Sequence, residues 1–166
     1  MISAIVAVDN NWGIGFNGEL LERIPNDMAR FRTMTEHHMV VCGRKTWESI
    51  PNTPLSNRLA MVVSSKGFSV EPGAMFLDMS HLKVILDQVK NDDELEWFII
   101  GGGEIYKQLL PYCDRVYVTK IYKDHDNVDT YFPNLDTDSE WELTHESLMG
   151  LYKDISYQYL DYDRIS

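Results

Sequence analysis

The sequence has 166 residues, 44% of them hydrophobic and 11% aromatic, which is enough for a buried core and excludes a disordered chain. Its formal net charge of −11 disfavours non-specific binding to nucleic acid or to anionic membrane surfaces. We therefore expect one domain spanning residues 1–166.

The chain begins with an apolar segment, residues 2–8, which is typical of a buried strand. The segment lacks the basic start and the small-residue cleavage site of a secretory signal. No run approaches the roughly 18 apolar residues of a membrane span. We therefore expect a cytoplasmic protein that does not bind membranes.

A Gly- and Asn-rich loop is predicted over 9–24, and a helix is predicted to start at Pro25. Proline favours the first turn of a helix because its missing N–H is not needed there. Met28 and Phe31 then recur on one face of this helix.

The remaining elements are predicted from apolar runs, which indicate strands, and from apolar residues spaced three or four apart, which indicate helices. Ser80 can cap a helix with an apolar stripe of Leu82, Ile85, Leu86 and Val89. The other predicted elements are a strand at 39–42 ending at Gly43, helical turns at 44–50, a polar turn at 51–57, strands at 59–64 and 97–100, a helix from 103 to 110, and strands at 115–122, 141–147 and 156–162. This order predicts an α/β fold: a mostly parallel central sheet of about eight strands, with helices on both faces and an antiparallel C-terminal edge.

Ligands of such a sheet bind at the carboxyl ends of its strands, where Gly101-Gly102-Gly103 is expected to lie. Glycines between a strand and a helix let backbone N–H groups approach a phosphate closely. A tight turn is the alternative, but a turn needs only one glycine. The spacing is not G-x-G-x-x-G, so an ordinary Rossmann fingerprint is not supported.

Basic residues follow two other predicted strands, at Gly43-Arg44-Lys45-Thr46 and at Ser64-Ser65-Lys66. Arginine can bind a phosphate through two hydrogen bonds. Each segment alone is consistent with an ordinary polar loop. Together with the glycine turn, they predict a site for a dinucleotide that carries an additional phosphate.

Asp27 is the most informative carboxylate, because Ile24, Met28 and Phe31 are its neighbours one helical turn away or less. An acid in an apolar pocket can pair with an amidine-like edge of a ligand through two hydrogen bonds. The alternative is a solvated acid that stabilises the helix dipole.

Other polar residues suggest no chemistry of their own. Glu19 and Glu22 are interpreted as loop charges, and Asp124–Asp129 as a solvated charge run around His125 without metal-ligand spacing. Cys42 and Cys113 also lack such spacing, so we expect reduced core thiols and no metal site.

Several motifs, in order along essentially the whole chain, resemble those of bacterial-type dihydrofolate reductases. These are Val8-Asp9 with Ile14-Gly15, Ile24-Pro25-x-Asp27, Phe31, the run from Gly43 to Ile50 (GRKTWESI), Arg58, Ser64-Ser65, the run from Ile100 to Tyr106 (IGGGEIY) and the run from Asp129 to Pro133 (DTYFP). The resemblance implies reduction of 7,8-dihydrofolate to tetrahydrofolate by hydride transfer from NADPH, in support of one-carbon and thymidylate metabolism. It also implies a monomer that binds antifolate inhibitors.

The resemblance assigns residues to the substrate and to the reaction. Asp27 would bind the 2-amino group and N3 of the pterin and favour protonation of N5, Thr119 would support Asp27 through a water, and Arg58 would hold the glutamate α-carboxylate. The substrate residues are Ile5, Ala7, Asp27, Met28, Phe31, Ile50, Leu55, Arg58, Ile100 and Thr119, and the catalytic residues are Asp27, Leu20 and Tyr106.

The implied cofactor residues fall into three groups. Arg44, Lys45, Ser65 and Lys66 would lie at the 2′-phosphate; Thr46, Gly101, Gly102 and Gly103 at the pyrophosphate; and Ala7, Ile14, Ile100 and Tyr106 around the nicotinamide. The resemblance also implies cofactor contacts for Gly15, Gly43, Ser64, Glu104, Ile105 and Gln108. The loop 9–24 would be a mobile lid over the nicotinamide.

The chain departs from the family pattern within this loop. The family has Leu/Met-Pro-Trp, and its tryptophan helps to order a water at the pterin, whereas this chain has Leu20-Leu21-Glu22. Glu22 could lie beside Asp27, where two carboxyl groups would share a poorly solvated site, or it could face solvent on the lid.

Two other functions stay open from the sequence. One is a reductase of the same fold that acts on a pyrimidine or on another pterin. The other is a folate- or nucleotide-binding protein with little turnover. Arg58 favours dihydrofolate, because this arginine needs a substrate carboxylate to explain its position.

Overall fold

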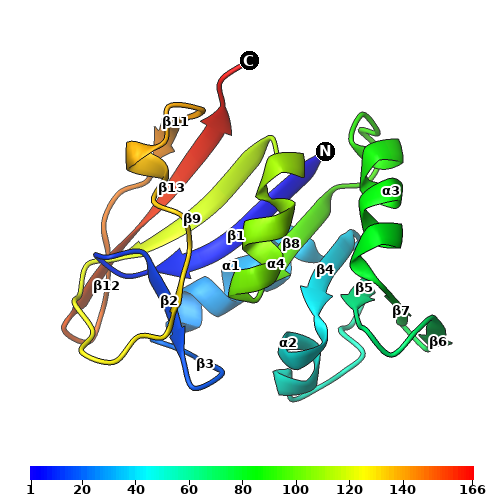
Figure 1. Cartoon of the computed structure of the whole chain (residues 1–166). Coiled ribbons are helices and arrows are strands. Elements are labelled where there is room, and N and C mark those ends of the chain that lie inside the picture. Colours follow the sequence, from blue (N-terminus) through cyan, green and yellow to red (C-terminus); the bar gives the residue numbers. More distant parts are fainter.

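A computed structural model describes residues 1–166 and arranges them around one ten-stranded sheet (Figure 1). The strand order is β11-β13-β9-β1-β8-β4-β5-β7-β6, and β12 pairs with β13 beside this path. The strands of this sheet are β1 (Ile2–Val8), β4 (Met39–Gly43), β5 (Leu59–Val63), β6 (Ser69–Glu71), β7 (Ala74–Leu77), β8 (Trp97–Gly101), β9 (Arg115–Ile121), β11 (Trp141–Glu146), β12 (Gly150–Tyr152) and β13 (Ile155–Arg164).

The centre of the sheet is parallel, as predicted. β1 pairs in parallel with β8 and β9, and β4 pairs in parallel with β5 and β8. These strands are covered on both faces, which is why they consist of nearly continuous apolar residues. Val40, Val41 and Cys42 of β4, for example, are completely buried. Cys113 is also a buried free thiol, which confirms the predicted state of both cysteines.

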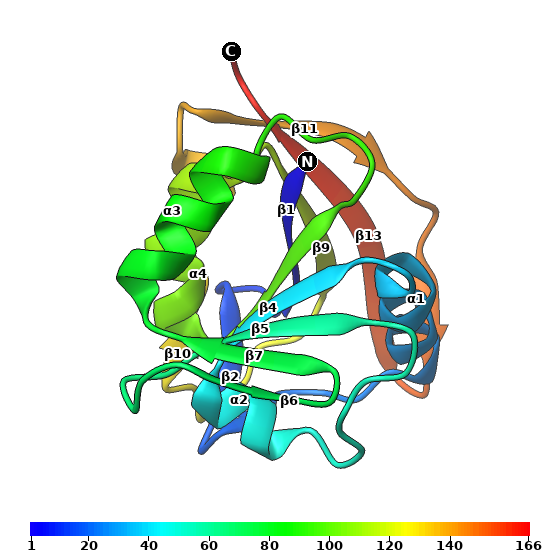
Figure 2. The ribbon, with the colours of Figure 1, turned by 90° about the vertical axis from the view of Figure 1, so that its right-hand side faces the viewer.

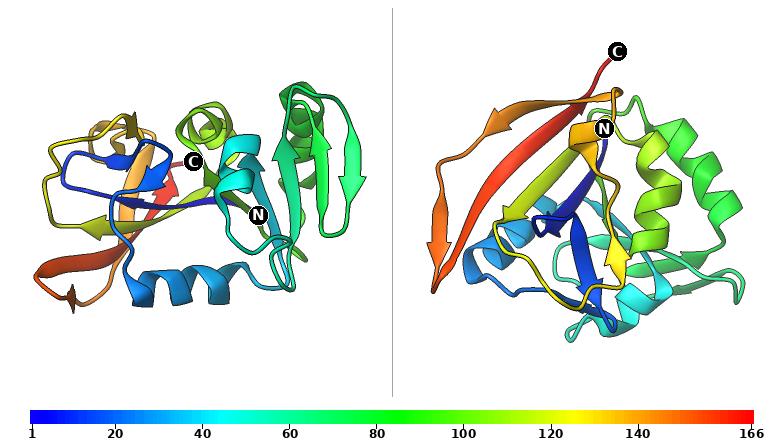
Figure 3. Two further views of the ribbon diagram at one scale, coloured as in Figure 1. Left: turned by 90° about the horizontal axis from the view of Figure 1, so that it is seen from below. Right: turned by 60° about the vertical axis from the view of Figure 1, so that its left-hand side comes forward.

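Helices cover both faces of the sheet (Figures 2 and 3). They are α1 (Pro25–Thr35), α2 (Arg44–Ser49), α3 (Met79–Val89) and α4 (Gly103–Leu109), with short 3-10 turns at Leu110–Tyr112 and Leu135–Thr137. Leu82, Leu86 and Leu109 bury α3 and α4 in the larger core, while α1 lies on the opposite face. With 11 residues in each of the longest helices, none is long and apolar enough to cross a membrane.

Two helix starts can be compared with the prediction. Pro25 occupies the first turn of α1, as expected. The predicted cap of α3 is wrong, because Asp78 and not Ser80 is the N-cap residue. The Asp78 carboxylate accepts from the backbone N–H of His81 at 2.9 Å, while Ser80 donates its hydroxyl to the same oxygen at 2.8 Å. Asp and Ser are comparable N-cap residues, so side-chain type alone does not locate the cap. The cap is Asp78 because its backbone is extended, as an N-cap residue requires.

The C-terminal edge is antiparallel, as predicted, because β13 runs antiparallel to both β9 and β11. The short strands β6, β7 and β12 add to the predicted set. β6 and β7 form a second antiparallel edge, and β12 forms a hairpin with β13. Their three or four residues are too few to display a clear alternation.

The predicted loop at 9–24, called the lid below, contains two short strands. β2 (Gly13–Phe16) and β3 (Glu19–Leu20) form a hairpin around Asn17 and Gly18, both with positive φ. β10 (Thr130–Tyr131) pairs with β2 and completes a separate three-stranded sheet. The pairing partner comes from more than a hundred residues away, so local sequence patterns do not reveal it.

Candidate active site

Helix α1 places the carboxyl group of Asp27 directly against the central sheet. The Thr119 hydroxyl on β9 donates a hydrogen bond to Oδ1 of Asp27 at 2.5 Å. Thr119 lies in register with Ala7 on β1 and with Tyr159 on β13. The expected bridging water between Thr119 and Asp27 is therefore wrong, because the two side chains contact each other directly.

The surroundings of Asp27 disfavour its charged form. Burial raises the pKa of this carboxyl group, and the Thr119 hydrogen bond and the positive charge of Arg30 oppose the shift without cancelling it. A carboxyl group with a raised pKa can hold or supply a proton closer to neutral pH than an exposed one. Perturbed groups of this kind are typical of active sites.

Four of the apolar residues predicted to wall the pterin site pack against one core cluster. The core cluster that contains Trp47 and Phe98 has these partly buried residues packed against it: Ile5 of β1, Ile50 and Leu55 of the loop between α2 and β5, and Ile100 of β8. Met28 and Phe31 on α1 are exposed and half-buried, respectively. The predicted wall residues therefore keep surfaces open to a ligand, and their joint contact with a pterin stays a prediction.

Arg58 is fixed near the C-terminal end of α1. Its Nε donates to the carbonyl oxygen of Ser56 at 3.0 Å and its Nη1 donates to Thr35 Oγ1 at 3.1 Å. The guanidinium carbon lies 5.9 Å from the ring centre of Phe31. These contacts hold the guanidinium at the far end of the wall from Asp27 and leave Nη2 without a hydrogen bond inside the chain.

We expect Thr119→Val to move the pH dependence of the reaction. The hydroxyl of Thr119 stabilises ionised Asp27, so its loss should raise the pKa of Asp27 further. Activity that needs the proton should then persist to a pH higher by about 1 pH unit, the scale of one charge-assisted hydrogen bond.

The measurement is the rate of hydride transfer against pH for both proteins. Thr119→Ser keeps the donor and should restore the original profile. Thr33→Val, on the outer face of α1, is the matched control. An unmoved profile for Thr119→Val would show that the hydroxyl does not act on Asp27.

The ends of β4 and β5 form a basic site. Arg44 Nη1 donates to Ser64 Oγ at 3.2 Å, and Arg44 Nε donates to Glu48 at 2.9 Å. Ser64 is buried and also accepts from the backbone N–H of Lys66 at 3.2 Å. Ser64 thus orients Arg44 and Lys66, while the side chains of Lys45 and Ser65 are exposed.

The glycine turn lies where β8 meets α4. Gly101 has φ +120, which favours glycine, and a side chain there would approach the ring of Tyr106 to 3.2 Å. A Cβ on Gly103 would lie 2.4 Å from Thr130. The backbone at Gly102 passes close to Thr46, so α2 and this turn face each other.

Tyr106 is buried, and its hydroxyl donates to the carbonyl oxygen of Ile5 at 2.7 Å. Burial is the main reason that the pKa of this phenol is raised far above its ordinary value, so it stays neutral. It therefore fixes β1 relative to α4 at the edge of the predicted nicotinamide site.

The other predicted cofactor and lid residues lie on α4 and on the β2–β3 hairpin of the lid. Ile14 and Ile105 are buried, Gly15 pairs with both Leu20 and Thr130, and Gln108 donates to Glu104 at 3.1 Å. Leu20, predicted to be catalytic, is 47% exposed on β3.

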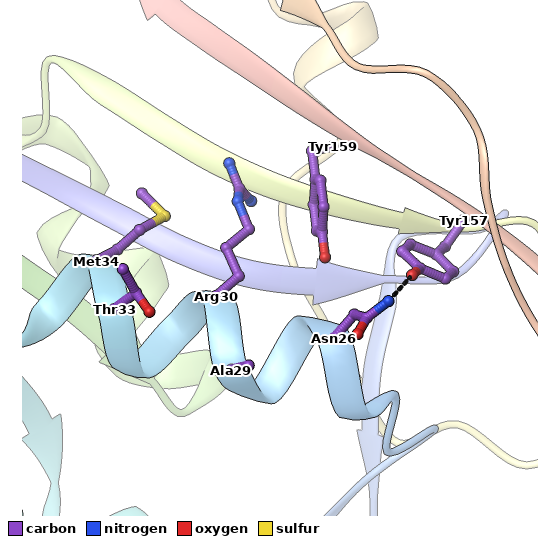
Figure 4. A pocket seen from close by; sticks show the side chains of 7 residues that line it. All are labelled: Asn26, Ala29, Arg30, Thr33, Met34, Tyr157 and Tyr159. Atoms are coloured by element: carbon purple, nitrogen blue, oxygen red, sulfur yellow. Dashed lines mark hydrogen bonds between the residues drawn. The ribbon is translucent and has the colours of Figure 1, made fainter.

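A separate groove of about 460 Å³ lies between α1 and β13 (Figure 4). Arg30 extends from α1 over the ring of Tyr159, with its guanidinium carbon 4.0 Å from the ring centre, and Asn26 donates to the Tyr157 hydroxyl at 3.2 Å. Asp27 and Phe31 do not line this groove. It therefore belongs to the other face of α1 and is distinct from the predicted pterin site.

Neither predicted placement of Glu22 is correct. Its carboxylate accepts from Lys123 Nζ at 2.9 Å and pairs with Nε2 of His125 at 3.1 Å. Partial burial alone would raise the pKa of Glu22, but Lys123 and His125 outweigh it and lower the pKa. Glu22 does not contribute to the pKa of Asp27, which Thr119 and Arg30 affect instead.

His125 is the polar residue that the sequence analysis missed. The interpretation of this segment as solvated is wrong for His125, whose side chain is only 12% exposed. Its Nδ1 lies 3.0 Å from Asp9 Oδ2, on the opposite side of the ring from Glu22. His125 lies more than a hundred residues from Asp9 and Glu22, so no local sequence pattern indicates this contact. The only hint in the sequence was that Glu22 stands where the family has a tryptophan.

Comparisons with known proteins agree with this geometry. A family model for dihydrofolate reductase matches residues 1–164. The dihydrofolate reductase of Bacillus subtilis is 38% identical over 166 residues, which cover 99% of this chain and 95% of that protein. That of Haemophilus influenzae is 40% identical, over 85% and 83% of the two chains. A solved structure of dihydrofolate reductase from Enterococcus faecalis, complexed with NADP(H) and RAB-propyl, has a TM-score of 0.84 at 31% identity and covers 100% of this chain and 97% of that one.

Proposed function

The chain belongs to the dihydrofolate reductase family and reduces dihydrofolate with NADPH, and we propose that this reaction depends on Asp27. The observation that carries the proposal is the half-buried carboxyl group of Asp27, bonded to Thr119 and with a raised pKa. Membership of the family makes a pyrimidine or another pterin the less favoured substrate.

Asp27 would orient the pterin by accepting hydrogen bonds from its 2-amino group and N3, which form a planar donor pair. The oxygen that bonds to Thr119 is fixed by that contact, so the carboxyl plane is set before the ligand binds. Ile5, Ile50 and Ile100 would pack against the ring faces. Positioning of this kind lowers the entropic part of the barrier.

Asp27 would also favour protonation at N5 of the substrate. A negative carboxylate in a poorly solvated site raises the proton affinity of a ligand bound to it. The raised pKa of Asp27 supports this role, because burial disfavours an uncompensated negative charge there. The lid would exclude water from the reacting atoms.

NADPH, when bound, supplies the hydride that reduces the pterin. The residues present fit this cofactor: the glycine turn opens α4 with Gly102 facing Thr46 of α2, and Arg44 with Lys66 provides positive charge at the neighbouring strand ends. Arg44 and Lys45 would bind the 2′-phosphate, while Thr46 and the glycine turn would bind the pyrophosphate.

We further propose that the protein acts as a cytoplasmic monomer in one-carbon and thymidylate metabolism. All predicted substrate and cofactor residues come from one chain, so the site needs no second copy. Compounds that imitate the pterin edge and pair with Asp27 are expected to inhibit it as antifolates do.

The test is NADPH oxidation with dihydrofolate, with a dihydropterin that lacks the glutamate tail, and with an amino-pyrimidine. Oxidation that is fastest with dihydrofolate supports the proposal. A preference for the pyrimidine would indicate the alternative reductase, and binding without oxidation would indicate a folate-binding protein.

Arg58→Leu should raise KM for dihydrofolate by roughly 10-fold to 100-fold, because one charge-assisted contact to the glutamate carboxylate is lost. The KM of the tail-less dihydropterin should change little. Steady-state kinetics with both substrates gives the comparison. Arg32→Leu, an exposed arginine of α1, controls for the lost charge, and equal effects on both substrates would contradict the role of Arg58.

A further inference from the structure

His125 joins the two ends of the lid. Asp9 begins the lid, Glu22 lies near its end, and the ring of His125 lies between their carboxylates at 3.0 Å and 3.1 Å. Lys123 adds an ion pair to the same oxygen of Glu22 at 2.9 Å. We call Asp9, Glu22, Lys123 and His125 the lid clasp.

The chemistry of the clasp depends on protonation. A carboxylate only accepts hydrogen bonds, and neutral imidazole has only one N–H to donate. Both contacts of His125 can therefore be hydrogen bonds to ionised Asp9 and Glu22 only when both ring nitrogens carry protons. The geometry fits the imidazolium form, and neutral His125 must lose one of its two partners.

Asp9 extends the clasp into the lid backbone. Its side chain is almost completely buried, and its Oδ1 accepts from the backbone N–H groups of Asn11 at 2.9 Å and Gly13 at 2.8 Å. The backbone N–H of Asn10 donates to the carbonyl oxygen of Lys123 at 3.1 Å. A change at His125 therefore reaches the first turn of the lid.

We propose that His125 is a positioning residue for the lid: its imidazolium fastens both ends of residues 9–24 to the loop after β9, and deprotonation releases one of them. The proposal extends the proposed function, because it concerns the segment that would cover the nicotinamide. His125 itself does not touch the reacting atoms.

Several charged groups lie around the ring of His125. Those of the lid, of its own loop and of β9 that the contacts place nearest to it are Asp9, Glu22, Lys123, Asp124, Asp126 and Lys120. The two carboxylates in contact with the ring stabilise its positive charge, and Lys123 contacts Glu22 on the outer side. While Asp9 and Glu22 are ionised, fastening should weaken as rising pH removes the second proton of the imidazole ring.

The test is amide hydrogen exchange of the ligand-free protein between about pH 5 and pH 9, a range that brackets the titration of a model imidazole. Exchange of the ligand-free protein reports on the lid itself, without the pH dependence of the reaction. Exchange rates of residues 10–13 and 19–24 are divided by the intrinsic rates of the same peptides, and NMR of the His125 ring protons follows its titration.

The wild-type lid should lose protection by roughly tenfold as His125 loses its proton, the effect of one charge-assisted hydrogen bond. His125→Gln should show the lower protection at every pH. Glu22→Gln should make the exchange protection of residues 19–24 independent of pH. Because Glu22 is more exposed than His125, this variant gives a second test should His125→Gln fold poorly. His145→Gln, an exposed histidine on β11, should behave like wild type.

Lid protection that does not change with pH in the wild type, or that changes equally in His125→Gln, would overturn the proposal. Failure to oxidise NADPH with dihydrofolate would overturn the proposed function instead. That failure would leave the exchange result unaffected, so the two outcomes are distinguishable.

Discussion

Asp27→Asn should lower kcat/KM for dihydrofolate at neutral pH by on the order of 10²-fold or more, the range for loss of a group that assists proton transfer. The amide has nearly the same shape and can still contact Thr119, so the fold and the pocket should be preserved. It cannot carry the negative charge that raises the proton affinity of the bound pterin.

Acid should partly rescue the Asp27→Asn variant, because substrate that is already protonated needs less assistance. The measurement is the single-turnover rate of hydride transfer across the pH range in both proteins. Asp87→Asn, an exposed acid on α3, controls for the change of net charge. A variant as fast as wild type at neutral pH would remove Asp27 from the mechanism.

Replacing Arg44 and Lys45 together by glutamine should weaken NADPH by on the order of 10²-fold and leave NADH nearly unchanged. Charge-assisted hydrogen bonds to a phosphate contribute about 1.5–3 kcal/mol each. We use the low end, because Arg44 already shares its guanidinium with Glu48 and Ser64 and because Lys45 is exposed.

The measurement is the Kd of each cofactor by fluorescence titration. Lys90→Gln with Lys153→Gln removes two exposed positive charges elsewhere and should affect NADPH only slightly. If the Arg44 and Lys45 variant weakens both cofactors equally, these residues do not bind the 2′-phosphate.

The parallel core could be predicted because its strands are buried on both faces and read as apolar runs, as at residues 39–42 and 97–100. Pro25 likewise marked the start of α1 through its own geometry. Signals of this kind lie within a few residues of the feature that they predict.

Features that depend on distant partners could not be predicted in the same way. β2 is strand because Thr130 and Tyr131 pair with it, and Asp9 and Glu22 are tied by His125. In the site, local spacing suggested that Asp27 faces an apolar pocket. Its direct bond to Thr119 depends on how α1 crosses β9, which the sequence does not specify.

The most direct test of the account is a single turnover in which excess enzyme with bound NADPH is mixed with dihydrofolate. We expect one NADPH to be consumed for each tetrahydrofolate formed, at a rate that falls as the pH rises and the pair of Asp27 and bound pterin loses its proton. Binding of both ligands without oxidation of NADPH, or a rate independent of pH, would contradict it.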